Sequence, residues 1–487
     1  MRPAVVLATL LLSGVLATGA AAAAVLPAPP PRGFDRGMSD GRLLMHPDPV
    51  RRAAAMRESA AAGATVVRLP VSWRSLFQGE VDWASPEARD PNHPAYRFAF
   101  IDNAVRSAVD AGLTPLLMVF RAPNNALTSP IWPYARMGSW APRPAALQAF
   151  ATAIARRYDG AFPDPARPGA VLPRVKLWQA WNEPNLVNYL EPQWVARGGT
   201  WAPFTPAWYR RMLNAFYAGV KSVHPDNVVA AAGIAPAGSP VDGDGRMTPL
   251  RFLHAFLCLR PPPSLRTDPT CPDAPRFDAL AFHPLSTGDP DRAARSRMDV
   301  AIADLHKVTR PLEAAGRAGF LGPAPRPRLW VTELNWETGA PPGRVPPNHE
   351  YGYVSRGLER LWRAGADLIT WHFLTDPPTL LDGRSRPAGL RRVAPDGGIG
   401  APKQLLRGFR FPLVVSRRDA GTIHVWSAPP GGAPTIVLER RVGAGWRPLA
   451  TWTARRVLDT DVRLPRGATL RMRSGAQYSA AVLVRAP

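Results

Sequence analysis

Short apolar runs alternate with longer amphipathic patterns along most of the chain. Eight short runs have the composition of buried strands, at 33–41, 64–71, 114–120, 175–180, 228–232, 279–283, 329–332 and 367–373. Segments with helical spacing follow them, at 50–62, 96–111, 144–158, 206–223, 249–259, within 298–318, 349–364 and 403–409. Thr205 is expected to cap the helix over 206–223. Strands that alternate with helices are typical of a parallel α/β fold.

Eight strand–helix repeats over residues 33–410 predict a (β/α)₈ TIM barrel with long loops. A doubly wound open sheet is the alternative arrangement. It would need a glycine-rich phosphate-binding loop after the first strand, and the sequence has none there. The barrel is therefore the preferred fold.

The pattern changes after residue 411, where short strand-like segments are separated by Gly, Pro or Asp turns. The segments are 422–427, 435–442, 447–454, 462–464, 469–474 and 480–484. They predict a small antiparallel β-sandwich domain over 411–487, with 395–402 as the boundary region. Few ionisable groups of catalytic type occur in it, so we expect a supporting or binding role.

The amino terminus has the pattern of a secretory signal peptide. Met1 and Arg2 precede an apolar run over 4–16 and an alanine-rich stretch that ends at Ala24. We expect cleavage after a signal peptide of 1–24, followed by a Pro/Ala-rich linker at 25–32. No later segment is apolar enough to cross a bilayer. The pattern predicts a secreted, periplasmic or envelope-associated protein, and we expect a monomer.

Cys258 and Cys271 are the two cysteines of the chain. A closely spaced pair in an exported protein predicts a disulfide, with two free thiols as the alternative. Closing a loop of this length stabilises a fold by about 3 kcal/mol in the chain-entropy model. No histidine cluster lies nearby, so a metal site is not expected there.

The net charge of +23 comes mostly from arginine, because lysine occurs only at 176, 221, 307 and 403. The arginines are spread over every segment and form no basic run, which argues against nucleic acid as a partner. Compositional bias is one explanation of the charge, and an anionic carbohydrate substrate is another. No cofactor is expected.

The stretch VKLWQAWNEPN places a carboxyl group at the end of a buried strand. Val175 and Leu177 are apolar, and Pro184 cannot donate to a sheet ladder, so the strand must end at or before Glu183. A charge in that place costs free energy unless it is paired or used. Glu183 is therefore a candidate catalytic acid, with a salt-bridged loop residue as the alternative.

A second carboxyl group stands in the same position after the seventh strand, where LWVTELNWET places Glu333. The ends of strands four and seven face one another across the barrel mouth, where barrel active sites lie. Two opposed carboxyl groups are the requirement for cleaving a glycosidic bond. Glu337 competes with Glu333 for the second position, but it lies beyond the strand end.

These two motifs, WNEP and WVTE, resemble those of the clan A glycoside hydrolases, in particular the cellulase-like family 5 and the xylosidase- and iduronidase-containing family 39. The resemblance covers 33–409, the whole predicted barrel. It implies that Glu183 is the acid/base, that Asn182 bonds the sugar 2-hydroxyl and that Glu333 is the nucleophile.

The resemblance also assigns expected roles to residues at other strand ends. Arg68 would pair with Glu333 and lower the pKa of that carboxyl group. His283 would contact the nucleophile, although the family often has tyrosine there. Trp371 would form the floor of the innermost sugar site. Weaker candidates for the rim of the site are Trp73, Trp181, Trp336, Asn124 and Asn125. Each of these could instead be an ordinary core or loop residue.

The expected reaction is hydrolysis by double displacement with net retention, for which the two carboxyl groups should lie about 5–5.5 Å apart, against about 6.5–9.5 Å for inversion. The charge of Glu333 should hold the proton on Glu183 until the glycosyl-enzyme forms. Two other functions remain open. The chain could be a carbohydrate-binding protein on an inactive barrel, or an envelope scaffold protein.

Overall fold

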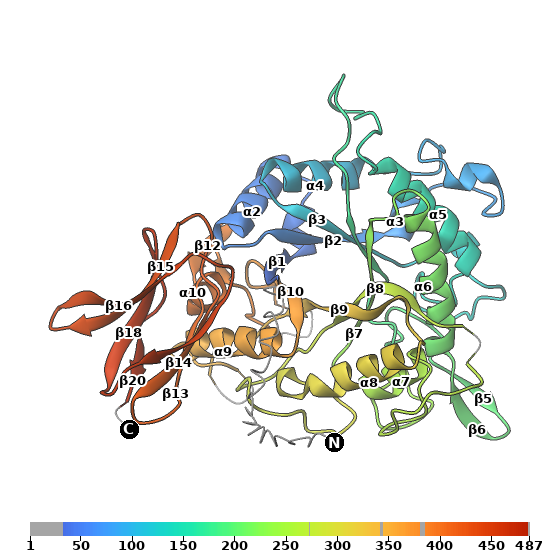
Figure 1. Cartoon of the computed structure of the whole chain (residues 1–487). Coiled ribbons are helices and arrows are strands. Elements are labelled where there is room, and N and C mark those ends of the chain that lie inside the picture. The colour runs from blue at the N-terminus through green and yellow to red at the C-terminus, as the bar shows by residue number, and fades with distance from the viewer. Residues whose placement is uncertain (1–32, 272, 341–343, 380–384, 486–487) are drawn as a thin grey trace, which may run out of the picture. The chain divides into compact units, whose positions relative to one another are not determined.

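A closed barrel of eight parallel strands forms the centre of the molecule (Figure 1). The computed structural model describes residues 33–271, 273–340, 344–379 and 385–485. The strands are β1 (Asp35–Ser39), β2 (Val66–Ser72), β3 (Thr114–Phe120), β4 (Leu177–Ala180), β7 (Val228–Ile234), β8 (Arg276–Phe282), β9 (Gly322–Leu334) and β10 (Ala366–His372). Hydrogen bonding between β1 and β10 closes the ring. The predicted TIM barrel is confirmed.

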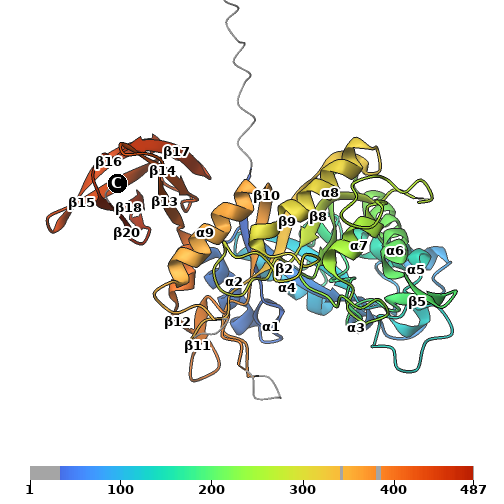
Figure 2. The ribbon, with the colours of Figure 1, turned by 90° about the horizontal axis from the view of Figure 1, so that it is seen from below.

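Helices cover the outside of the barrel (Figure 2). They are α2 (Pro49–Ala61), α4 (Ala99–Asp110), α5 (Pro144–Arg157), α6 (Thr205–Lys221), α7 (Pro249–Phe256), α8 (His306–Arg317), α9 (Glu350–Arg363) and α10 (Gln404–Arg410). Figure 2 shows α5, α6, α7 and α8 in chain order along one side of the barrel. Helix α2 begins as capping rules require, because Asp48 accepts from the backbone of Val50 at 2.8 Å. The prediction for Thr205 was wrong. It is the first residue of α6, and its hydroxyl donates to Gln193 instead.

Apolar side chains fill the barrel interior towards the amino ends of the strands, and polar side chains fill it towards the carboxyl ends. The apolar cluster comes from alternate positions of the strands, with Trp330 as its largest side chain. Two residues further along β9, Thr332 also points inward and contacts His283. Polar groups are therefore collected at the carboxyl ends of the strands, where the loops begin.

The carboxyl-terminal strands form two antiparallel sheets, as predicted for a sandwich. One sheet consists of β13 (Leu413–Arg417), β14 (Thr422–Ser427) and β17 (Leu458–Arg463). The other consists of β15 (Thr435–Val442), β16 (Gly445–Thr453), β18 (Ala468–Ser474), β19 (Gln477–Tyr478) and β20 (Val482–Val484). The sequence pattern missed β13 and β19. The segment expected as a boundary contributes to a hairpin of β11 (Arg391–Val393) and β12 (Ile399–Pro402).

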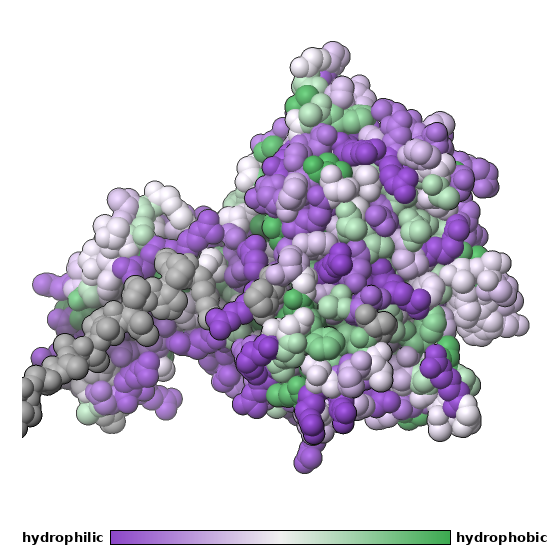
Figure 3. Space-filling model, turned by 45° about the vertical axis from the view of Figure 1, so that its right-hand side comes forward, coloured by the Kyte–Doolittle hydropathy of each residue, from purple (hydrophilic) through white to green (hydrophobic). Residues whose placement is uncertain are grey.

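The chain from residue 33 onward forms one compact unit, so the domain boundary at 410/411 stays a prediction. Trp426 of β14 is fully buried within the same apolar core as the barrel helices, with its ring 6.2 Å from that of Trp362 on α9. The face in Figure 3 shows strongly hydrophilic residues scattered among apolar ones, in keeping with the dispersed arginines. The predicted leader and linker, 1–32, lie outside the described residues.

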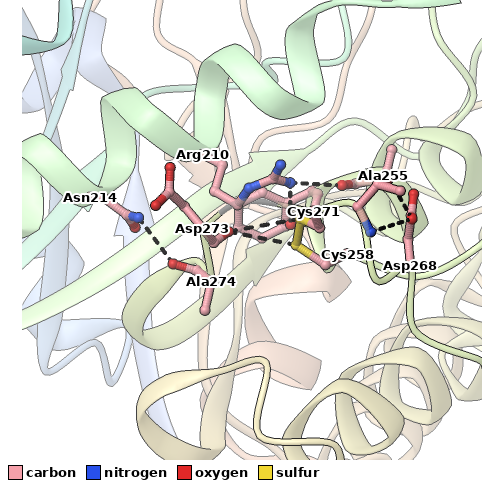
Figure 4. The surroundings of a disulfide bond; sticks show 10 residues. Arg210, Asn214, Ala255, Cys258, Asp268, Cys271, Asp273 and Ala274 are labelled. Carbon is pink, nitrogen blue, oxygen red and sulfur yellow. Dashed lines mark hydrogen bonds between the residues drawn. A yellow bond between two sulfur atoms is a disulfide. The ribbon is translucent and has the colours of Figure 1, made fainter.

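The predicted disulfide between Cys258 and Cys271 is confirmed (Figure 4). It joins the residues just after α7 to the segment that leads into β8. Arg210 and Asn214 of α6 donate to the backbone of Ala255 and Ala274 around it, at 2.8 and 3.0 Å. The bridge therefore fixes the connection between a helix and the next barrel strand. Among the helices of the described segments, none is both long and apolar enough to cross a membrane.

Candidate active site

The backbone around Glu183 is held in a strained conformation. Strand β4 ends at Ala180, and both Trp181 (φ 73°) and Glu183 (φ 38°) have positive φ angles, which are costly for residues other than glycine. Two neighbouring strands hold this turn, because Trp181 N donates to Val119 O at 2.8 Å and Glu183 N donates to Gly233 O at 3.0 Å. The turn directs the carboxyl group of Glu183 to the mouth of the barrel.

A β-bulge places Glu333 at the same mouth. In the pairing of β9 with β10, Val331 is opposite Ile369 and Leu334 is opposite Trp371, so Thr332 and Glu333 together are opposite Thr370 alone. Regular alternation would point adjacent residues to opposite faces, and a bulge breaks that rule. Both side chains consequently reach the interior.

The guanidinium of Arg68 connects the two glutamate motifs. Its Nη1 donates to Glu333 Oε1 at 2.7 Å, and its Nη2 donates to Asn182 Oδ1 at 2.5 Å. Its Nε donates to Gln179 Oε1 at 2.9 Å, so the whole buried side chain is fixed. Arg68 thus pairs with Glu333 in the way that the resemblance implied. The side-chain oxygen of Asn182 is bound by Arg68, and its side chain also interacts with Tyr189.

The charges around Glu333 keep it ionised. Burial alone would raise the pKa of this carboxyl group, but His283, His372 and Arg68 outweigh burial and lower the pKa to about 2. Burial lowers the pKa of His372, although Glu333 partly opposes this effect, so the imidazole is neutral at pH 7. Arg68 contributes a permanent positive charge to this effect, through a direct contact of 2.7 Å with Glu333.

His283, which follows β8, contacts both carboxyl groups. Its Nδ1 lies 3.0 Å from Glu183 Oε1 and 3.8 Å from Glu333 Oε2, and its Nε2 lies 3.0 Å from Thr332 Oγ1. We expected a contact with Glu333, but Glu183 is the nearer partner. The fit is tight, because a Cβ on Gly233 would lie 2.9 Å from His283 Nε2.

The two glutamates lie close together and reach solvent. Each side chain is 13% exposed, and one oxygen of each, with a nitrogen of His283, falls within 4.8 Å of the others. Such a set could in principle hold a cation. However, the guanidinium of Arg68 already contacts Glu333 and would repel one, so the charges favour a carboxylate pair without a metal.

Four tryptophans predicted to bind sugar are instead buried in the core. Trp371, Trp73, Trp181 and Trp336 are each at most 1% exposed and offer no free ring face as the structure stands. Trp371 packs near Phe409 of α10, on the outer side of the barrel, and its Nε1 donates to Ala388 O at 3.1 Å. These predictions were wrong, and strand alternation explains the case of Trp371, because its neighbour faces inward.

That neighbour, His372, was missed by the sequence reasoning. Its Nε2 lies 3.9 Å from Glu333 Oε2. Tyr189 was also missed, and burial together with Glu183 and Glu333 raises its pKa to about 12. Thr370 and His372 both point inward, but the sequence does not show which alternate set of strand residues does so. Tyr189 is a loop residue, and no pattern in the sequence marked it.

The remaining candidates lie in loops after the strands. Asn124 accepts a hydrogen bond from Arg74 at 2.7 Å, and both amide atoms of Asn125 are buried without a hydrogen-bond partner. Glu337 is 36% exposed and lies 3.8 Å from Arg344 and 3.9 Å from a second arginine. Its surroundings are those of a solvated loop residue, in contrast to those of Glu333.

Comparison with solved structures finds similar folds in several glycoside hydrolases. The chain is similar to a family 39 glycoside hydrolase from the gut symbiont Bacteroides cellulosilyticus WH2, with a TM-score of 0.50 and 17% identity over 88% of this chain and 79% of that chain. A glucosidase from Croceicoccus marinus has a TM-score of 0.49 and 15% identity, with 90% and 82% of the two chains covered. GH5_18 from Streptomyces cattleya in complex with GlcNAc has a TM-score of 0.46 and 15% identity, with 78% and 79% covered.

No family model matches the sequence, and no curated protein matches it significantly. At 17% identity, the similarity to the family 39 enzyme is one of fold. It confirms the barrel fold that the resemblance implied.

Proposed function

We propose that this chain is an exported, retaining glycoside hydrolase acting on β-linked sugars, with Glu183 as acid/base and Glu333 as nucleophile. The observation that carries the proposal is the closeness of the two carboxylates, since one oxygen of Glu183 and one oxygen of Glu333 lie within 4.8 Å of each other. Inverting enzymes need about 6.5–9.5 Å to admit a water molecule between the groups. The leader-like sequence of 1–24 supports export.

In the first step Glu333 attacks the anomeric carbon of the sugar. Arg68 holds its Oε1. We assign the attack to Oε2, which lies 3.8 Å from His283 and 3.9 Å from His372, beyond hydrogen-bond distance. As the bond from Oε2 to carbon forms, the bond to the leaving oxygen breaks and Glu183 donates its proton to that oxygen. The products are a glycosyl-enzyme ester and the free leaving group.

In the second step the roles reverse. The carboxylate of Glu183 accepts a proton from water, the water oxygen attacks the anomeric carbon, and Glu333 departs as a carboxylate. His283 acts as a positioning residue, since it holds Glu183 from one ring nitrogen and Thr332 from the other. We assign the hydrogen bond to the sugar hydroxyl next to the reacting carbon to the NH₂ group of Asn182, which lies beside Tyr189.

The test compares Glu333→Gln with Glu337→Gln on a panel of aryl β-glycosides. Removal of a nucleophile costs several orders of magnitude, so we expect Glu333→Gln to lose at least about 10⁴-fold in kcat. Glu337→Gln changes the same chemical group four residues away and should stay within about twofold, because its surroundings are those of a solvated loop. Equal activity of both variants would refute the assignment.

The stereochemistry of the product provides a second readout. Proton NMR of the first sugar released should show the anomer of the substrate, as double displacement requires. Release of the opposite anomer would exclude Glu333 as a nucleophile. If the wild type cleaves no glycoside in the panel but still binds polysaccharide, the chain is a binding protein on a glycosidase fold.

A further inference from the structure

An exposed apolar cluster lies on the loop that follows β3. Within residues 131–137 four large apolar side chains face solvent, with exposures of 38%, 48%, 80% and 67% for Ile131, Trp132, Tyr134 and Met137. The Trp132 and Tyr134 rings are 5.4 Å apart in an edge-on arrangement, and Trp140 lies 6.2 Å from Trp132. We call residues 131–140 the aromatic loop. An exposed apolar patch of this kind marks an interaction site.

A buried carboxylate fixes the aromatic loop to the loop that carries Glu183. Glu191 is buried, and its carboxylate accepts from Arg136 N at 2.7 Å and from the Ser139 hydroxyl. Its backbone N donates to Ser139 O at 2.9 Å, and its O accepts from Ala141 N at 2.7 Å. The aromatic side chains are therefore exposed on a rigid support, and little ordering is needed when they bind a ligand.

The place of the aromatic loop determines which part of a substrate could reach it. Glu191 is joined to Glu183 by a short stretch of one loop, and both β3 and β4 end at the barrel mouth. Glu183 is the group that protonates the leaving oxygen in the proposed function. The leaving group therefore departs on the side of Glu183, whose loop also carries Glu191 and so anchors the aromatic loop.

We propose that Trp132 and Tyr134 form a stacking platform for the pyranose rings of the leaving group, so that the natural substrate is an oligosaccharide or polysaccharide. The C–H face of a pyranose is apolar and flat, and it stacks on aromatic rings. The rings do not occupy the catalytic centre, and they act through binding alone. This inference rests on the proposed function and deepens it.

The experiment measures Trp132→Ala/Tyr134→Ala on two substrates of the same sugar. The first is a β-linked hexasaccharide, and the second is the glycosyl fluoride, whose leaving group is too small to reach the platform. We expect kcat/KM for the hexasaccharide to fall by about 10- to 100-fold, as the loss of two stacking contacts implies. The value for the fluoride should stay within about twofold.

Two further variants separate stacking from other effects. Trp132→Phe/Tyr134→Phe keeps both rings and should retain most of the hexasaccharide activity. Tyr478→Ala removes an aromatic ring of comparable exposure, 45%, from the carboxyl-terminal sheet and should change neither value. The thermal unfolding temperature of Trp132→Ala/Tyr134→Ala should equal that of the wild type, because the replaced side chains are exposed. Equal losses on both substrates, or no loss on the hexasaccharide, would overturn the platform.

A wild type that cleaves neither substrate would refute the proposed function but still leave the platform open to a direct test. Retardation in gels that contain xylan, mannan or mixed-linkage glucan should occur for the wild type and disappear in Trp132→Ala/Tyr134→Ala. Absence of retardation in all three polymers would overturn the inference. Binding to anionic phospholipid vesicles that depends on the two rings would also overturn it, in favour of a membrane contact.

Discussion

Replacement of Arg68 by methionine is the perturbation that separates the electrostatic role of this residue from packing. Methionine fills a similar volume but removes the charge and every hydrogen-bond donor. The variant would leave Glu333 partly buried without its closest cation, and Asn182 and Gln179 without their partner. Breaking a buried ion pair by removing one member costs about 3–5 kcal/mol.

The pKa of Glu333 reports the combined effect of all its surroundings on the carboxylate. It is lowered from an ordinary value of 4.5 to about 2 in the folded chain. The unfolded chain therefore binds a proton at higher pH than the folded chain does. The stabilisation is fully present above about pH 4.5 and is lost as the pH falls towards 2. The shift corresponds to about 3 kcal/mol, which is the net effect of burial, His283, His372 and Arg68 together.

The assay is the pH dependence of kcat/KM on an activated aryl glycoside. In the wild type we expect no loss of activity on the acid side down to about pH 4, because Glu333 stays ionised. Arg68→Met removes one of the groups that lower the pKa of Glu333, so this pKa should rise towards its ordinary value. The acid limb should then lie at a higher pH than in the wild type. Urea unfolding at pH 7 should show a loss of about 3 kcal/mol.

The matched control is Arg106→Met, which breaks another buried ion pair, with Asp164 at 2.6 Å. It should reduce the free energy of unfolding by a similar amount, without moving the acid limb. If Arg68→Met keeps the acid limb of the wild type, Arg68 does not control the ionisation of Glu333. If Arg106→Met moves the limb as well, the shift reports general destabilisation.

Three further changes have outcomes that the structure predicts. Gly233→Ala should lower kcat at least about tenfold, since the residue has a positive φ and the added methyl would clash with side chains of the site. Gly319 has a similar φ but open space around it, so Gly319→Ala should only lower stability by about 1 kcal/mol. Replacing Cys258 and Cys271 by serine should cost about 3 kcal/mol in urea unfolding and leave kcat unchanged. Trp426→Ala should lower the melting temperature, by creating a cavity worth about 3–5 kcal/mol, without a change in kcat at low temperature.

The barrel and both glutamates were predictable because buried parallel strands have a plain sequence pattern. Runs of apolar residues identified all eight strands, and the polar residues that end them identified Glu183 and Glu333. Strand order then placed the two at one mouth. Arg68 followed from the same logic, as a charged residue inside an apolar run. The sequence thus predicted at which end of its strand each of these residues lies.

The direction of side chains was the part that the sequence could not provide. The bulge at Thr332 and Glu333 depends on the pairing of β9 with β10, and a single strand carries no sign of it. Trp371 and His372 are neighbours at a strand end, and one residue of register decides which of them faces the carboxylates. Trp73, Trp181 and Trp336 are buried by contacts between distant segments, which composition does not reveal.

Backbone strain and buried polarity gather at the same end of the barrel, and this bears on the choice between an enzyme and a scaffold. Among the described residues, seven other than glycine have positive φ, and five of these lie at or near the carboxyl ends of barrel strands: Arg121, Trp181, Glu183, Ala232 and Phe373. Each such conformation costs on the order of 1–3 kcal/mol. A buried ionic network is also often less stable than apolar packing of the same volume. A scaffold would gain stability by losing both features, whereas a hydrolase needs them to hold two carboxylates within reach of one sugar carbon.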